Sequence, residues 1–303
     1  MERDFFQSVF ERAAAAMKQG GKLHFARPTP LPEARPISLL PNPRVVIPLS
    51  GVMPFEYSDG EKIHFGANLL PGSGIYAGPY GWSNPGWNCV QEFVSLVFHN
   101  EYLRFIHLSH DGSPASPGGP DIGKEVYHTS LRPSRTVSLL VGVMNSYSES
   151  PADEREGALK VLLVLIEESL SLLRRDQPCR TGKAHRVYQN IRDFMRDNYS
   201  RPLTRELVAE RFSLNPCYVS RLFMDNGGSF NAYLMSLRMD QALHLLENSD
   251  ISIKEIAYHT GFNSTGYFIR CFSARYGVTP GAFREEAGRG GKEHDAGDFD
   301  GGI

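Results

Sequence analysis

The sequence predicts an α+β protein of two domains, an antiparallel β-barrel with accompanying helices followed by an all-helical domain. Three observations lead to this prediction. Short alternating apolar segments, separated by prolines and glycines, occupy residues 27–150, and the pattern becomes helical from residue 152. One helix-turn-helix pattern then occurs twice in residues 184–287, with a linker helix between the copies. A chain of 303 residues is long enough to form two hydrophobic cores.

The composition is that of an ordinary globular protein, with 41% hydrophobic and 22% charged residues. The longest uninterrupted apolar run, Val161–Ile166, is far shorter than the roughly 20 residues that a membrane-spanning helix needs. The N-terminus has neither the basic start nor the apolar stretch of a signal peptide, so we expect a cytoplasmic location and no membrane partner. Four widely spaced cysteines without a C-x-x-C motif predict reduced thiols rather than disulfides or a zinc site.

The net charge of −2 is unevenly distributed along the chain. Between Ala184 and Arg284 there are 12 Lys and Arg against 9 Asp and Glu, a balance of +3 that leaves −5 for the remainder. The basic excess therefore coincides with the repeat. Because the excess is modest, it supports nucleic-acid binding only weakly, and the repeat is the stronger evidence.

Residues 27–150 are expected to form the barrel, preceded by an amphipathic helix or arm in residues 1–26. Asp59-Gly60 is a hairpin signal between two strands. The proline-rich stretch Pro114–Pro120 is predicted to be a loop. The predicted strands are Val45–Leu49, Phe55–Tyr57, Ile63–Phe65, Val94–Phe98 and Leu103–Leu108.

Residues 151–183 are predicted to form a dimerisation helix and a linker. Apolar residues recur in this helix in alternating steps of four and three, as in a coiled-coil seam: Leu159, Leu163, Ile166, Leu170 and Leu173. Other apolar residues lie off the seam, so the helix is apolar on more than one side. Two interpretations follow: the seam joins two chains in a homodimer, or the whole helix is buried within one chain. The linker is Arg174–Lys183, and the glycine-rich residues 288–303 are expected to be disordered.

The two copies of the repeat superimpose after a shift of 48 or 49 positions, which places Arg221 on Arg270. Each copy is predicted to contain a short helix, a turn and a second helix, and the second helix of such a unit enters the major groove of DNA. The continuous helical pattern Phe230–Glu247 between the copies would hold them at a fixed separation. Two recognition helices could then enter successive major grooves about 34 Å apart.

The apolar positions of the second helices are assigned to the domain core, among them Tyr218 and Phe223 in one copy and Tyr267 and Phe272 in the other. The outward positions follow from helical spacing and would lie against base edges, where arginine suits guanine. The alternative for the two arginines is a surface ion pair or a phosphate contact. The predicted DNA-binding residues are Asn215, Pro216, Cys217, Ser220, Arg221, Met224, Ser264, Thr265, Gly266, Ile269, Arg270 and Ser273.

Several short motifs surround these positions. They are Leu203-Thr204, Tyr218-Val219-Ser220-Arg221-Leu222-Phe223, Leu237-Arg238, Ile253-Lys254-Glu255-Ile256-Ala257, Gly261-Phe262, Tyr267-Phe268, Arg270, Phe272 and Tyr276-Gly277-Val278-Thr279-Pro280. Together they resemble the DNA-binding domain of the AraC/XylS family of bacterial transcription regulators, over about the last third of the chain. The resemblance implies operator DNA and RNA polymerase as partners, with transcription activation as a typical role. Gly266 and Ile269 depart from the polar residues that are common in the family, so we expect the second recognition helix to contribute more affinity than discrimination.

The resemblance continues more faintly upstream, where Arg44–Pro79 is similar to the cupin-like sensor barrel of such regulators. That likeness implies a small-molecule effector. Aromatic side chains among glycines in residues 76–87 would suit stacking against a sugar or another flat ligand in the barrel mouth. The alternative is an aromatic loop that plugs the barrel or lines an interface. The candidate effector-binding residues are Tyr76, Tyr80, Trp82 and Trp87.

Two other classes of function remain as alternatives. Four histidines, His64, His99, His107 and His110, raise the alternative of a metal-dependent cupin enzyme fused to a DNA-binding domain. They lack a His-x-His followed by a carboxylate, and the chain lacks a nucleophile elbow and a phosphate-binding loop, so we predict no metal, no cofactor and no catalysis. The second alternative is a redox-sensing regulator in which oxidation of Cys217 blocks entry into the groove. The main prediction is an effector-controlled transcription regulator that binds DNA as a homodimer.

Overall fold

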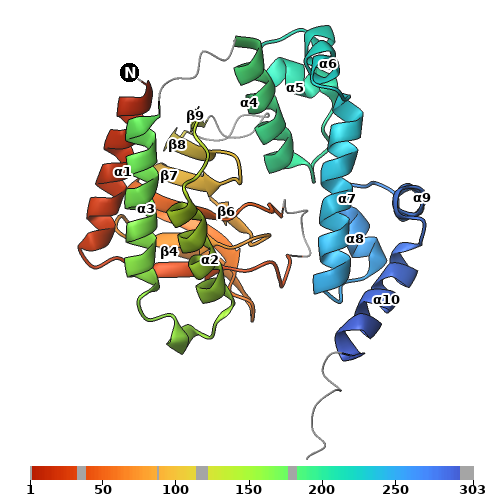
Figure 1. Ribbon diagram of the computed structural model, residues 1–303, viewed down its shortest axis with the longest axis horizontal. Helices are drawn as coiled ribbons and strands as arrows, with labels where there is room; N and C mark the ends of the chain where they lie inside the picture. Colours follow the sequence, from red (N-terminus) through yellow and green to blue (C-terminus); the bar gives the residue numbers. More distant parts are fainter. Residues whose placement is uncertain (1, 33–38, 87–88, 114–121, 177–182, 294–303) are drawn as a thin grey trace, which may run out of the picture. The chain divides into compact units, whose positions relative to one another are not determined.

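The computed structural model describes residues 2–32, 39–86, 89–113, 122–176 and 183–293. The chain forms two compact units, the first of residues 1–31 and 39–180 and the second of residues 32–38 and 181–303. The first unit combines β-sheets with helices, whereas the second is helical (Figure 1). This arrangement confirms the predicted α+β class. Trp87, Cys179 and most of the predicted loop and linker lie outside the described residues.

The first unit contains two β-sheets. The larger sheet has the strand order β1-β5-β2-β7-β8-β9, in which only β1 and β5 are parallel, and the smaller has the order β4-β3-β6. Neither sheet closes on itself within the described strands, so the structure shows two open sheets, and a cupin-like barrel stays a prediction. The strands are β1 (Leu23–Ala26), β2 (Arg44–Gly51), β3 (Met53–Ser58), β4 (Ile63–Leu69), β5 (Gly74–Ala77), β6 (Ser83–Pro85), β7 (Val90–Phe98), β8 (Leu103–Asp111) and β9 (Gly123–His128).

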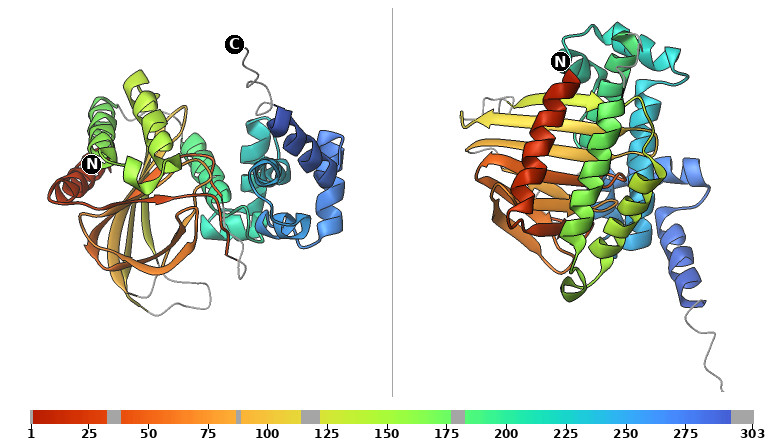
Figure 2. Two further views of the ribbon diagram at one scale, coloured as in Figure 1. Left: turned by 90° about the horizontal axis from the view of Figure 1, so that it is seen from below. Right: turned by 60° about the vertical axis from the view of Figure 1, so that its left-hand side comes forward.

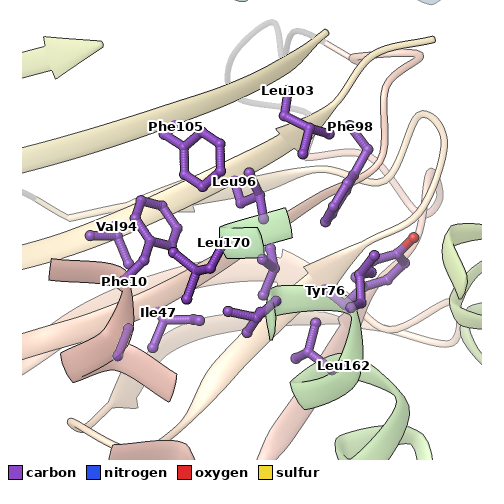
Figure 3. Packing of buried hydrophobic residues seen from close by; sticks show 14 of the residues in the cluster. Phe10, Ile47, Tyr76, Val94, Leu96, Phe98, Leu103, Phe105, Leu162 and Leu170 are labelled. Atoms are coloured by element: carbon purple, nitrogen blue, oxygen red, sulfur yellow. The ribbon is translucent and has the colours of Figure 1, made fainter. Parts of the chain in front are cut away.

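Three helices cover one face of the larger sheet, as the right-hand view of Figure 2 shows: α1 (Glu2–Lys18), α2 (Arg135–Glu149) and α3 (Ala158–Arg175). Side chains from the helices and the strands meet in one core, where Phe10 and Leu162 pack with Val94 and Phe105 (Figure 3). The opposite face of the sheet packs against the smaller sheet in a second core. A sheet covered on both faces buries successive residues, which is why Val94–Phe98 is a continuous apolar run apart from one serine.

The apolar seam of α3 packs against other residues of the first unit. Ile166, Leu170 and Leu173 are at most 3% exposed, and Leu162 off the seam is fully buried. In both figures α3 lies between α1 and α2, and it contacts each of them. Leu159 and Leu163, the other two residues of the predicted seam, are half-buried. Three of the five seam residues are therefore buried within one chain, and dimerisation stays a prediction.

The Asp59-Gly60 hairpin is confirmed, since β3 and β4 pair as antiparallel neighbours across residues 59–62. The Asp59 carboxylate accepts hydrogen bonds from the Glu61 and Lys62 amides at 2.9 and 3.0 Å, and Gly60 has a φ of +101°. Burial alone would raise the pKa of Asp59. Hydrogen bonds from His64 and from the two amides outweigh burial and lower that pKa to about 2.

The second unit contains seven helices within the described residues: α4 (Lys183–Asn198), α5 (Arg205–Arg211), α6 (Pro216–Asp225), α7 (Phe230–Asn248), α8 (Ile253–His259), α9 (Thr265–Tyr276) and α10 (Pro280–Glu293). α7 spans the segment predicted as the rod between the two copies. α10 extends to Glu293, into a stretch that the sequence predicts as disordered. No described helix of either unit has the length and apolar character needed to cross a bilayer.

Candidate nucleic-acid interface

The first helix-turn-helix unit consists of α5 and α6. Thr204 caps α5 by accepting a hydrogen bond from the Leu207 amide at 3.1 Å. Asn215 caps α6 through the Cys217 amide at 2.8 Å, and Pro216 is the first helical residue, where its missing N–H has no cost. These caps fix where the recognition helix begins.

The second unit, α8 and α9, is built in the same way. Ser252 and Glu255 form a capping box at the start of α8, and Ser264 caps α9 by accepting from the Tyr267 amide at 3.3 Å. The buried residues Phe268 and Phe272 hold α9 on the core of the second unit. Both units therefore begin their recognition helices with a polar cap.

The turns between the two helices of each unit have the same backbone geometry. Ser213 and Gly261, which coincide in the repeat, have φ values of +52° and +82°. Their amides donate to the carbonyls of Glu210 and Tyr258. A Cβ on Gly261 would lie 2.8 Å from the Tyr199 carbonyl oxygen, so glycine is needed there, whereas the first copy tolerates a serine in the left-handed region.

The predicted recognition positions lie on the exposed side of each second helix. In α6, Cys217, Arg221 and Met224 are exposed, and Ser220 is half-buried. Met224 is 69% exposed, although it is a large apolar side chain. In α9 the exposed residues are Gly266 and Arg270, with Thr265, Ile269 and Ser273 half-buried. Asn215 and Ser264 are exposed at the starts of α6 and α9, and Pro216 is half-buried.

Each recognition arginine lies over the ring of the tyrosine three residues before it. The guanidinium carbon of Arg221 is 5.2 Å from the ring centre of Tyr218, and that of Arg270 is 5.9 Å from the ring centre of Tyr267. Tyr267 is 49% exposed. The prediction that these tyrosines pack in the core is therefore wrong for Tyr267 and only partly right for Tyr218, whereas burial of Phe223 and Phe272 is confirmed. The i, i+3 spacing could have indicated these cation–π pairs.

Two other arginines near the recognition helices form ion pairs within the second unit. Arg205 of α5 donates to the Ser220 hydroxyl of α6 at 3.2 Å and pairs with Glu206 at 2.7 Å. Arg275 pairs with Asp240 at 3.2 Å. The first copy thus brings a second guanidinium next to its recognition helix, whereas Ile269 occupies the position in α9 that corresponds to Ser220.

Arg238 of α7 joins the two helix-turn-helix units, and sequence reasoning assigned it no role. Its guanidinium donates to the Tyr199 carbonyl at 3.0 Å and to the Arg201 carbonyl at 3.1 Å, just before the first unit. The same group lies 5.6 Å from the ring centre of Phe262, in the turn of the second unit. Burial lowers the pKa of Arg238. One side chain of α7 therefore contacts both the segment before the first unit and the turn of the second.

The candidate effector residues of the first unit are largely enclosed. Tyr76 is fully buried and donates to the Asn145 side chain at 2.8 Å, and burial raises its pKa. Trp82 is also fully buried, and its indole donates to the Pro30 carbonyl at 3.1 Å. Tyr80 is half-buried, and Trp87 lies outside the described residues. An effector site at these residues stays a prediction, and in this structure Tyr76 and Trp82 present no ring face to a ligand.

The histidines of the first unit have local partners rather than a common centre. His64 lies 2.5 Å from the Asp59 carboxylate, and His107 lies 2.9 Å from the Glu92 carboxylate. His99 stacks on Tyr102. Across the described residues, no group of three or more His, Cys, Asp or Glu side chains is placed to hold a metal ion.

Comparison with known proteins places this repeat in a family. A family model described as a helix-turn-helix domain matches residues 208–286. The HTH-type transcriptional regulator YijO of Escherichia coli K12 is 30% identical over 245 residues, which cover 80% of this chain and 81% of YijO. The chain belongs to the AraC family of transcriptional regulators. The match to YijO is longer than the second unit, so the AraC-family likeness includes part of the first.

Other relatives match over shorter stretches. The regulatory protein PocR of Salmonella typhimurium is 44% identical over 85 residues, 28% of this chain and 28% of PocR. The HTH-type transcriptional regulator GlxA of Rhizobium meliloti is 34% identical over 110 residues, 36% of this chain and 34% of GlxA. The chain thus matches only about a third of these two relatives. Among solved structures, the C-terminal domain of AraT from Geobacillus stearothermophilus is 31% identical, covers 35% of this chain and 88% of that chain, and has a TM-score of 0.33.

Proposed function

We propose that this regulator binds a specific operator sequence by inserting α6 and α9 into major grooves of DNA. The observation that carries the proposal is the matched pair of exposed arginines, Arg221 and Arg270, each lying over a tyrosine ring. A guanidinium presents a planar fork of donors that fits the major-groove edge of guanine. Stacking on the ring holds this fork in place before DNA arrives, so less side-chain freedom is lost on binding.

The two recognition helices are proposed to contribute unequally. α6 offers a thiol, a hydroxyl and a thioether at Cys217, Ser220 and Met224, together with Arg221. α9 offers Gly266 and Ile269 beside Arg270, and the isoleucine suits contact with a thymine methyl group. Hydrogen-bonding side chains discriminate between bases more strongly than apolar ones do. We therefore assign most of the sequence discrimination to α6.

Selection of DNA ligands from a random pool with the full chain tests the proposal. The enriched sequence is expected to bind at least about a thousandfold more tightly than random DNA at physiological salt. The selected positions should fall into two clusters, with the more tightly specified cluster assigned to α6. A pool that does not converge, or an enriched sequence that binds no better than random DNA, would contradict the proposal of sequence-specific binding.

We also propose that the chain forms a homodimer through the exposed side of α2 and α3. From Thr136 to Ser148, α2 has no charged residue, although one side of it faces solvent. Leu139 is 62% and Val143 44% exposed, and Val164 on the adjacent α3 is 48% exposed. A solvent-facing helix normally carries charges. A neutral face suits a second copy of itself, because two-fold pairing then brings no like charges together.

Leu139→Glu is expected to convert the dimer to a monomer, because the new carboxylates would be buried next to each other at the two-fold axis. Sedimentation velocity of the full chain measures this. Phe65→Glu is the matched control, since Phe65 is 70% exposed on β4, away from α2. Its dimer should persist. A wild-type monomer, or a dimer that survives Leu139→Glu, would contradict the proposed interface.

Control by a small-molecule effector bound in the first unit completes the proposal. Bound effector would shift the equilibrium between states that differ in affinity for the operator, and no chemical reaction is required. By the family resemblance, RNA polymerase is the second macromolecular partner, and the site of action is the cytoplasm. Membership of a family of regulators supports a non-enzymatic role.

A further inference from the structure

A cleft of about 550 Å³ opens in the first unit between the C-terminal end of α1, strand β1 and the turn from β4 to β5. Its volume falls within the range of small-molecule sites. Ala16, Leu70 and Pro71 form apolar walls, and Gln19, Lys22 and Asn68 bring polar side chains. Tyr76, Tyr80 and Trp82, the described aromatic residues that the sequence singles out, do not line it.

Close backbone packing forms this cleft without help from flexible side chains. A Cβ on Gly21 would overlap the Gly72 carbonyl, and one on Gly72, whose φ is +89°, would lie 3.0 Å from the Ala16 carbonyl oxygen. The Gly74 amide donates to the Lys22 carbonyl at 2.9 Å. The Ser73 hydroxyl is already occupied, since it bonds to the amide and the carbonyl of Leu70. The shape is therefore present before a ligand binds.

Charge in the cleft favours a single negative group. Among the described residues of the lining, Lys22 is the one with a charged side chain. The Nδ1 atom of His24 lies 3.0 Å from the Tyr57 hydroxyl, and burial, together with the charges of Lys22 and His64, lowers the pKa of His24, which favours the neutral ring. The C-terminal end of α1 adds roughly half a negative charge, which the full positive charge of Lys22 exceeds.

We propose that this cleft binds a small organic carboxylate, with its anionic group held by Lys22 and His24 and its apolar body against Leu70 and Pro71. One ammonium and a neutral imidazole match a monoanion better than a phosphate dianion, which needs more donors and more positive charge. The proposal names the effector class and site, and so it rests on the proposed control by an effector.

Helix α1 links the cleft to the end of the first unit. Its C-terminal residues line the cleft, and its N-terminal part holds the end of α3, where Arg3 donates to the Asp176 carbonyl at 3.2 Å and Glu11 pairs with Arg174 at 2.9 Å. The Asp176 carboxylate in turn accepts from the Ser130 hydroxyl at 2.7 Å and the Tyr127 hydroxyl at 2.8 Å. Asp176 is the last described residue before the second unit. A ligand that moves α1 would thus act on the exit from the first unit.

The test is a fluorine NMR titration of the full chain with 4-fluorobenzoate and, as the neutral comparison, 4-fluorobenzamide. The carboxylate is expected to bind at least about tenfold more tightly than the amide. Lys22→Gln should abolish this difference. Lys18→Gln, the matched control at the end of α1 and outside the cleft, should keep it. Equal binding of both compounds, no binding of either, or loss of the difference in Lys18→Gln would overturn the proposal.

A second measurement distinguishes the carboxylate site from the proposed regulation by an effector. It compares operator affinity with and without saturating 4-fluorobenzoate. If 4-fluorobenzoate binds in a Lys22-dependent way but leaves operator affinity unchanged, the carboxylate site is supported. The proposal that this class of ligand controls DNA binding is then overturned. Lys22-dependent binding with changed operator affinity supports both.

Discussion

Replacement of Arg238 by alanine is expected to lower the free energy of unfolding of the second unit by about 2–3 kcal/mol. The substitution removes two charge-assisted hydrogen bonds and the contact with the Phe262 ring. The Tyr199 and Arg201 carbonyls then lose their donor, and the turn at Phe262 loses its packing partner. Because these groups lie directly before the first helix-turn-helix unit and in the turn of the second, operator affinity should fall together with stability.

Urea unfolding of the full chain measures this loss. Both tryptophans, Trp82 and Trp87, precede the second unit, so tryptophan fluorescence reports on the first unit, whereas helical circular dichroism also follows the second. Arg238→Ala should move the second unit's transition to lower urea and leave the fluorescence transition in place. Arg211→Ala, an exposed arginine at the end of α5, is the control and should change stability by less than about 0.5 kcal/mol. An Arg238→Ala chain as stable as this control would show that Arg238 does not join the units.

Replacement of Arg221 by alanine is expected to weaken operator binding by about 1–3 kcal/mol, which is about 5- to 150-fold. Affinity for random DNA should change little, because base contacts supply discrimination whereas phosphate contacts supply general affinity. Removal of the ring in Tyr218→Leu should weaken operator binding by about 0.5–1 kcal/mol, since the guanidinium loses its support. Fluorescence anisotropy on the selected operator and on random DNA measures both effects.

Arg221→Lys distinguishes base reading from phosphate anchoring. Lysine keeps the positive charge but lacks the planar fork, so it should retain affinity for random DNA and lose operator discrimination. If Arg221→Lys binds the operator as well as the wild type, or if Arg221→Ala weakens binding to both DNAs equally, Arg221 is a phosphate contact.

Local patterns of the second unit carried enough information to predict its architecture. The caps at Asn215, Ser252 and Ser264 and the turn at Gly261 depend on short-range chemistry, which local sequence patterns record. The core assignment of the tyrosines failed because a helical wheel shows which side of a helix a residue lies on but not how deeply its side chain is buried. An aromatic ring at the edge of the buried face also suits a cation–π contact. Arg238 was missed because its acceptors are backbone carbonyls some 40 residues away, which sequence spacing does not show.

The first unit was harder to predict because its sheets are covered by helices. Its predicted strands are present. The short strands β1, β5 and β6 and the helix α2 were not predicted, because their apolar residues show no clear periodicity. α2 lacks the charged face by which a surface helix is usually recognised, and this feature now supports its proposed role as an interface. The apolar seam of α3 indicated burial correctly but not what covers it, because tertiary packing and a coiled coil require similar residues.

The central claim is that α6 and α9 enter successive major grooves on one face of the duplex. Hydroxyl-radical footprinting of the full chain on its selected operator tests it most directly. Each bound chain is expected to protect two segments with centres about 10 base pairs apart, with Arg221→Ala weakening protection at one and Arg270→Ala at the other. A single protected segment, or two variants that weaken the same segment, would contradict the account.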